Sequence, residues 1–162
     1  MGYAIKLQPQ AAQIYTGDKV DVALTGSNTG TFTFTVVYVA KDEVCLLSDS
    51  NMGNANWSTA CAKSWGWSCK IGGKSYSSSD AGQSVAKIPT LEELYTKCHH
   101  VSIPDGIDIS TGDNEWTSST SNRFTNYIDY IGRSANKKLY FSGYVASSAG
   151  PYGTRIYISI VR

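Results

Sequence analysis

The sequence predicts an α+β domain in which two helices pack around a twisted, mostly antiparallel sheet. Three observations predict this class. Residues 19–48 alternate apolar and polar side chains in runs that are separated by turns. The segment AKIPTLEELYTKC carries a complete helix-start signal. Residues 115–162 contain four more short alternating runs, joined by connections rich in Ser, Asn and Gly.

Size and charge exclude several classes of protein. The 162 residues suffice for one domain, 1–162, and no linker divides them. A net charge of +1 argues against a non-specific electrostatic hold on nucleic acid. No run of about 18 apolar residues is present, so membrane insertion is not expected. The first residues, MGYAIKLQPQ, lack the apolar core of a signal peptide.

The first predicted strands form a meander. KVDVALTG and TFTFTVVYV alternate on either side of the turn GSNTG, and VCLLS follows the turn AKDE. Phe32, Phe34 and Val36 are expected on one face. Residues 1–16 are a weaker strand candidate, because Pro9 cannot donate a ladder hydrogen bond.

A first helix is predicted to begin at a cap on Asn54 or Asn56 and to run to about Trp65. Trp57, Cys61 and Trp65 are then spaced four residues apart and share one apolar stripe. Residues 66–84 are rich in Gly and Ser and are predicted to form a long loop.

The second helix has the stronger local signal. Thr90 and Glu93 form a capping box, in which each side chain accepts a hydrogen bond from the other residue's backbone N–H. One buried face is predicted to hold Leu91, Leu94, Tyr95 and Cys98. His99 and His100 end the helix, where a cationic imidazole is favoured by the helix dipole.

The chain has four cysteines, Cys45, Cys61, Cys69 and Cys98. A chain of this length does not need disulfides for stability, so buried free thiols are the favoured interpretation. A Cys61–Cys69 bridge is the alternative.

Metal sites and catalysis have little support in the sequence. The acidic loop holds Asp105, Asp108, Asp113, Asn114 and Glu115, whose oxygens suit calcium, but their spacing matches no EF-hand and a solvated loop is favoured. His99 and His100 point about 100° apart on a helix, so they do not easily share one metal, and Cys98 belongs to the apolar stripe. No nucleophile elbow, P-loop or dinucleotide motif occurs. We therefore predict a non-enzyme without a metal or cofactor.

The last third has the composition of a binding surface. Five of the eleven tyrosines lie between Tyr127 and Tyr152. Tyr offers large, stiff contact area, while Ser, Gly and Asn offer adaptable hydrogen bonds. The alternative is that β-rich domains place Tyr on strands and Ser in turns in any case. Binding is favoured because 122–127 and 143–152 combine loop character with aromatic residues.

The order of three motifs resembles the C-type lectin fold, in the branch that includes formylglycine-generating-type domains. These motifs are KIPTLEEL at 87–94, WTSST at 116–120 and VR at 161–162, and the resemblance covers residues 36–162. The Glu-Pro-Asn, Gln-Pro-Asn and Trp-Asn-Asp triplets of calcium-dependent lectins are absent, and no cysteine follows Cys98. The resemblance therefore implies the fold, and neither calcium-dependent sugar binding nor the oxidase activity.

Within that fold, the chain is most similar to variable proteins of diversity-generating retroelements. Adenine-directed mutagenesis in such proteins produces Asn, Tyr, Asp and Ser at scattered positions, and 122–130 and 142–152 have that composition. The resemblance implies a variable ligand-binding region at 115–155, with residues 1–35 as an N-terminal β extension outside the lectin-like part.

The functional hypothesis is non-enzymatic recognition of a protein or glycan on a target surface, with display on a virion or cell surface. The expected aromatic anchors are Trp116, Phe124, Tyr127, Tyr130, Tyr144 and Tyr152. The expected polar contacts are Asn122, Arg123, Asn126, Asp129 and Ser147. The alternative hypothesis is a structural or assembly module of a virion or surface fibre, which forms oligomers through residues 1–35.

Overall fold

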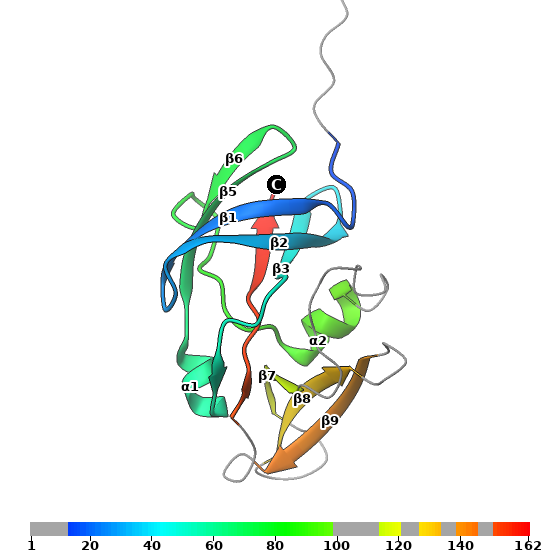
Figure 1. The fold of residues 1–162 in the computed structure, drawn as a ribbon. Coiled ribbons are helices and arrows are strands. Elements are labelled where there is room, and N and C mark those ends of the chain that lie inside the picture. The colour runs from blue at the N-terminus through cyan, green and yellow to red at the C-terminus, as the bar shows by residue number, and fades with distance from the viewer. Residues whose placement is uncertain (1–12, 99–113, 121–126, 134–138, 146–150) are drawn as a thin grey trace, which may run out of the picture.

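The computed structural model describes residues 13–98, 114–120, 127–133, 139–145 and 151–162, which form two sheets and short helices (Figure 1). The larger sheet has six strands in the order β11-β3-β2-β1-β5-β6, and every neighbouring pair is antiparallel. Its strands are β1 (Lys19–Gly26), β2 (Gly30–Val39), β3 (Glu43–Ser48), β5 (Trp65–Ile71), β6 (Lys74–Ser77) and β11 (Tyr157–Val161).

The smaller sheet has five strands in the order β4-β10-β7-β8-β9. They are β4 (Asn54–Ala55), β7 (Asn114–Thr120), β8 (Tyr127–Arg133), β9 (Leu139–Val145) and β10 (Tyr152–Gly153). β10 and β7 are parallel, and the other neighbours are antiparallel. The part of the chain described here is thus β-rich and mostly antiparallel, with two short helices, which confirms the coarse fold class.

The meander predicted over residues 19–48 is confirmed as β1, β2 and β3. Phe34 and Val36 are buried in the main core, and Phe32 packs against it. β1, however, lies between β2 and β5, and Val20, Val22 and Leu24 are core residues. Residues 19–35 are therefore an integral part of the large sheet and not an extension beside it.

The long loop predicted over residues 66–84 is wrong, because much of it is the hairpin β5–β6. Buried residues alternate along β5, at Trp65, Trp67, Cys69 and Ile71. This two-residue period places them on the core face. Gly72 and Gly73 make the turn, with φ of 58° and 78°, the left-handed conformation that two-residue hairpin turns need. The apolar residues at every second position favour a strand, and this preference outweighs the Gly- and Ser-rich composition that favours a loop.

The first helix is shorter than predicted. Helix α1 (Trp57–Ala62) begins at Asn56, whose side chain accepts a hydrogen bond from the backbone N–H of Thr59. The chain then leaves the helix, and Trp65 begins β5. The expected stripe that joined Trp65 to Trp57 and Cys61 on one helix is therefore wrong, although all three pack on the same core.

The second helix begins as predicted. Both bonds of the Thr90–Glu93 capping box are present at the start of α2 (Leu91–Glu93). The chain continues as a π-helical turn, η1 (Leu94–Cys98). Leu94 and Cys98 are buried and Leu91 packs beside them, as the spacing predicts. The side chain of Tyr95, and His99 and His100, lie outside the described residues.

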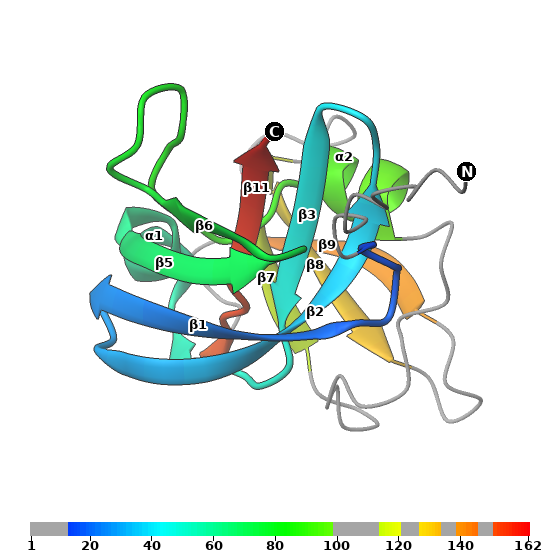
Figure 2. The same ribbon diagram turned by 90° about the horizontal axis from the view of Figure 1, so that it is seen from above.

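The large sheet is covered on both faces near its β11 edge. Alternate residues of β3 belong to different cores: Val44 and Leu46 to the main core, Cys45 and Leu47 to a second one. The second core is closed by Leu94 and Cys98 of η1. In Figure 1, the helix that begins at α2 lies between β2–β3 and the β7–β8–β9 strands, and Figure 2 shows the same layers from above. This explains why VCLLS is continuously apolar.

The four cysteines are free, and Cys45, Cys69 and Cys98 are buried, as the favoured interpretation predicts. No helix in the described residues is long and apolar enough to cross a membrane.

Candidate functional site

The candidate site is the end of the small sheet where β7 finishes and β8 begins. β7, β8 and β9 form an antiparallel meander, in which Tyr127 pairs with Val145 and Thr120 pairs with Ile128. Residues 121–126 join β7 to β8 at this end, and residues 146–150 leave β9 at the same end. The register therefore brings together the strand ends that flank 121–126, with four predicted contacts, and 146–150, with Ser147, which are 20 residues or more apart in the sequence.

The register also separates the candidates on β8 and β9 into two sets. Positions 128, 130, 142 and 144 alternate with positions 127, 129, 143 and 145 along the two strands, so the two sets belong to opposite faces of this pair. Tyr130 and Tyr144 are in the first set, and Tyr127 and Asp129 are in the second. One flat ligand surface does not include all four positions.

Trp116 is a core residue, which corrects the prediction that it is a binding anchor. Its side chain is only 1% exposed and belongs to the main core. The indole Nε1 donates a hydrogen bond of 2.6 Å to the carbonyl of Ala55 in β4. A buried indole usually has its N–H paired in this way. The aromatic residue of the WTSST motif therefore holds the sheet together and does not meet ligand.

Tyr152 lies beside Trp116 and away from the candidate sheet end. The two ring centroids are 4.5 Å apart with planes tilted by 42°, and Tyr152 is half-buried against the main core. Its strand β10 pairs with the first residues of β7, through Gly153 and Glu115. Tyr152 thus packs against Trp116, at the opposite end of β7 from residues 121–126.

β7 is fastened to both helices by hydrogen bonds. The indole Nε1 of Trp57 in α1 donates to the carbonyl of Thr117 at 2.9 Å. The N–H of Ser118 donates to the carbonyl of Pro89, and the N–H of Leu91 donates to Ser119 Oγ at 2.8 Å. The motifs KIPTLEEL and WTSST are therefore in direct contact. This gives the serines of WTSST a structural role at the start of α2.

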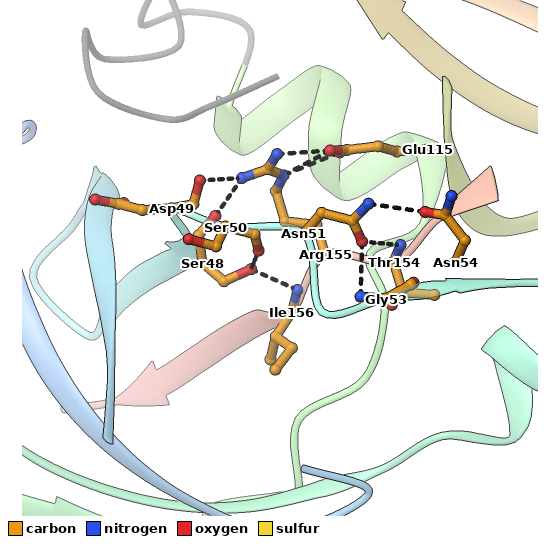
Figure 3. A network of polar contacts seen from close by, with 10 residues as sticks. All are labelled: Ser48, Asp49, Ser50, Asn51, Gly53, Asn54, Glu115, Thr154, Arg155 and Ile156. Carbon is orange, nitrogen blue, oxygen red and sulfur yellow. Dashed lines mark hydrogen bonds and ion pairs between the residues drawn. The ribbon is translucent and has the colours of Figure 1, made fainter. Parts of the chain in front are cut away.

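A buried ion pair joins β7 to the large sheet (Figure 3). Arg155 donates from Nε and Nη2 to both carboxylate oxygens of Glu115, at 2.6–3.0 Å. Its Nη1 donates to the carbonyls of Ser48 and Asp49, both at 2.7 Å. The two side chains are 2% and 4% exposed. Because Arg155 lies two residues before β11 and also binds the carbonyls of Ser48 and Asp49, the pair fixes the small sheet against the end of β3.

The segment between β3 and β4 completes this junction. Asn51 Oδ1 accepts hydrogen bonds from the N–H groups of Gly53 and Thr154, and the Thr154 hydroxyl donates to the carbonyl of Gly53. A Cβ on Gly153 would lie 2.6 Å from Asn51 Nδ2, so glycine permits this close approach. The junction, formed by Ser48–Asn51, Glu115 and 153–155, is polar and hydrogen-bonded, and it holds the start of β7, at the opposite end of that strand from the candidate sheet end.

A second polar cluster lies near the β11 edge of the large sheet. Glu43 accepts hydrogen bonds from Lys97, Ser159 and Cys45, and the Tyr157 hydroxyl donates to Cys45 Sγ at 2.9 Å. Burial raises the pKa of the Cys45 thiol to about 12, and burial also raises the pKa of Tyr157. Both groups therefore stay protonated at neutral pH, and Cys45 is not a thiolate nucleophile.

A shallow depression of about 330 Å³ lies on the β5–β6 hairpin, in the other sheet from the candidate sheet end. It is lined by Ser68, Cys69, Ser75, Tyr76, Ser77 and Asp80. None of the predicted contact residues is among them. The hairpin is therefore a suitable place for control substitutions.

Several predicted residues lie outside the described part of the chain. They are Asn122, Arg123, Phe124, Asn126 and Ser147, together with Asp105, Asp108 and Asp113 of the acidic loop. Both carboxylate oxygens of Glu115 accept hydrogen bonds from Arg155. Among the described residues, no group of three or more His, Cys, Asp or Glu is arranged to hold a metal.

The sequence reasoning missed Arg155 and Glu115 as the junction between the sheets. The available signal was an arginine at the head of the apolar run RIYISIV and a glutamate directly before the Trp of WTSST. Charged residues are almost never fully buried unless they are paired. A basic residue beside one core strand and an acidic residue beside another therefore indicate a buried ion pair.

Comparison of the chain with family models, with curated proteins and with solved structures found no match.

Proposed function

We propose that this chain is a non-enzymatic recognition protein that binds a protein or glycan at the end of its small sheet, on a scaffold of the C-type lectin type. The observation that carries the proposal is the pairing of Tyr127 with Val145. It brings the flanks of 121–126 and 146–150 together, and these segments hold five of the eleven predicted contacts. Connections between strands at one end of a sheet are a recurrent place for binding residues.

The scaffold supports this proposal because its polar and aromatic side chains are already used for structure. Trp116, Glu115 and Arg155 are buried, and the serines of WTSST contact α2. The two motifs on which the lectin resemblance depends touch each other through Pro89, Leu91, Ser118 and Ser119. We expect a support of this kind to tolerate replacement of residues at the sheet end, because the contacts named here are made without them. Tolerance of replacement is what a diversified recognition surface requires.

A binding experiment with matched variants tests recognition. Peptide and glycan arrays are probed with the labelled full-length chain, and every bound member is tested again with Tyr127→Ala, Asn126→Ala and Tyr144→Ala. Because positions 127 and 144 belong to opposite faces of the β8–β9 pair, we expect Asn126→Ala and one of the two tyrosine variants to weaken binding about tenfold or more. The control is Tyr76→Ala on the β5–β6 hairpin, which should bind as the unmodified chain does. Equal binding by all four variants would place the recognition surface elsewhere.

A second experiment tests the diversification mechanism independently of any ligand. The DNA around the coding region is sequenced and searched for a reverse transcriptase and for a near-copy of the 3′ end that differs at adenines. We expect the differing codons to fall within residues 115–155. If neither element is present, the protein is not a product of a retroelement, whatever it binds.

A further inference from the structure

The outer edge of β9 differs from the other sheet edges that the structure describes. β9 is the terminal strand of the small sheet, and it pairs along all seven residues with β8 on its other side. A terminal strand of this length presents a row of N–H and C=O groups that can pair with another strand. Its sequence, LYFSGYV, contains no charged residue and no proline. Charged residues and prolines are what usually protect an edge strand from pairing with another chain.

The other edges are protected or short. At the β11 edge, Gln83 Nε2 donates to the carbonyl of Val161 and Gln83 Oε1 accepts from its N–H, at 2.7 and 3.0 Å. The N–H of Tyr157 is bonded to the carbonyl of Lys87. β6 has four residues and begins with a lysine, and β4 has two residues. Among the described edge strands, β9 is therefore the one with the longest edge and without these protecting features.

We propose that β9 is a dimerisation edge, on which a second copy of this chain pairs its own β9 antiparallel across a two-fold axis at Ser142. The support is that the strand is self-complementary in this register. Leu139 falls opposite Val145, Tyr140 opposite Tyr144, and Phe141 opposite Gly143. These are an aliphatic pair, an aromatic pair and an aromatic residue over a glycine, each a favourable cross-strand combination.

The two-fold symmetry satisfies the geometry of a closed homodimer. An isologous interface uses the same patch on both copies, and a strand that is paired about its central residue meets this condition. The register centred on Ser142 is the one that pairs all seven residues of both strands. The product is a continuous ten-stranded sheet with five strands from each copy.

The dimer goes beyond the proposed recognition function and does not depend on it. Because the two β9 strands run in opposite directions, the two candidate sheet ends lie at opposite ends of the joined sheet. The pairing also places Tyr140 of one copy next to Tyr144 of the other, at the border of each candidate site. A bivalent target would then be bound more tightly than one site allows.

Equilibrium sedimentation of the full chain tests the proposal. The unmodified chain should show a monomer–dimer equilibrium. Ser142→Lys or Ser142→Glu alone places like charges opposite each other at the axis, and should raise the dimer Kd about fivefold or more. Mixing the two variants places opposite charges there and should restore a heterodimer. Ser75→Lys on β6, an edge of the other sheet, is the control and should dimerise as the unmodified chain does.

Hydrogen exchange of the unmodified chain keeps the test decisive if the Ser142 variants fail to fold. Alternate amides of β9 should exchange more slowly at concentrations where the dimer forms than in dilute solution. A chain that is monomeric over the whole concentration range overturns the proposal. So does a dimer that leaves the exchange of β9 unchanged, or a folded Ser142→Lys variant that dimerises with unaltered Kd.

Discussion

The guanidinium of Arg155 and the carboxylate of Glu115 form a bidentate ion pair between the two sheets, with both side chains nearly inaccessible to water. The same guanidinium holds the carbonyls of Ser48 and Asp49 at the end of β3. One side chain thus bonds to β7 and to the large sheet at once. Burial of two charges is costly, and the extra hydrogen bonds to backbone carbonyls are what offset the cost.

Removal of one member of this pair should be much more harmful than removal of both. Glu115→Ala leaves the buried Arg155 uncompensated, and we expect the free energy of unfolding to fall by about 3–5 kcal/mol. The double variant Glu115→Leu with Arg155→Met should recover most of this loss, because no buried charge remains. Urea denaturation of the variants measures both effects.

The control for this comparison is the more exposed pair of Lys19 and Asp49, whose side chains are 42% and 15% exposed. Lys19→Ala should cost about 1 kcal/mol or less, because water screens the pair. If Glu115→Ala costs no more than Lys19→Ala, the ion pair does not join the sheets in solution.

Trp116→Ala should unfold the protein more readily by about 3–5 kcal/mol, because a buried indole leaves a large cavity. Trp116→Phe keeps most of the volume but loses the hydrogen bond to Ala55, so it should cost less than the alanine variant. Thermal melts rank the two. If Tyr144 belongs to the proposed recognition surface, Tyr144→Ala should behave differently from Trp116→Ala. It should change the free energy of unfolding by less than about 0.5 kcal/mol. Similar losses from Trp116→Ala and Tyr144→Ala would mean that both rings are core.

The features that were predictable from the sequence are those set by neighbours along the chain. The Thr90–Glu93 capping box needs two residues three apart, and the meander needs only alternation and turns. Both appear as expected. The β5–β6 hairpin was missed because its Gly- and Ser-rich composition is typical of loops. Its four core residues, at every second position, are the better guide, because burial on one face requires that period.

The features that were not predictable depend on residues far apart in the sequence. Glu115 and Arg155 are 40 residues apart, and although each stands beside apolar residues, nothing local to either residue shows that the two meet. The role of Trp116 depends on a carbonyl 61 residues earlier. Its place among the small polar residues of WTSST favoured exposure, and only the contacts of β7 with β4 and α1 reverse that expectation. The same non-local register decides which candidate residues share an end of the sheet.

Thr90→Ala should lower stability by about 1 kcal/mol, because the N–H of Glu93 loses its acceptor at the start of α2. Glu93→Gln keeps a side-chain acceptor for the N–H of Thr90 and should cost less. Glu92→Gln, at the neighbouring exposed position, is the control for loss of charge near a helix start. Chemical denaturation of the three variants separates the cap from the charge, and equal losses in all three would contradict a role for the cap.

Acid should weaken the fold partly through Glu43. Burial raises the pKa of this carboxyl, but hydrogen bonds from Lys97, Ser159 and Cys45 outweigh burial and lower it below its ordinary value. A carboxyl with a lowered pKa in the folded state adds stability above its unfolded pKa, of about 4.3, and this stability is lost as the pH falls through the folded pKa. Glu43→Gln should therefore be less stable at pH 7 and lose less stability below pH 4. Melting temperatures across that range measure it, and parallel curves would exclude Glu43 as a source of acid sensitivity.

The four thiols should react at very different rates in the folded protein. Burial raises the pKa of Cys69 to about 11 and the pKa of Cys98 to about 12, and Cys45 is shifted similarly. Cys61 is half-buried, and burial raises its pKa too, so it should react more slowly than a free cysteine but faster than the other three. Alkylation with iodoacetamide at pH 8, followed by peptide mass spectrometry, should label Cys61 first.

Cys61→Ser is the control for this labelling, because it should remove the fast phase and leave the slow phases unchanged. The slow phases should accelerate when urea unfolds the chain, since they report opening of the two cores that hold Cys45, Cys69 and Cys98. Cys45 and Cys98 share the second core. A substitution that loosens η1, such as Leu94→Ala, should therefore increase the alkylation rates of both thiols and leave the rate of Cys69 unchanged. Labelling of Cys69 at the same increased rate would show that the two cores open as one unit.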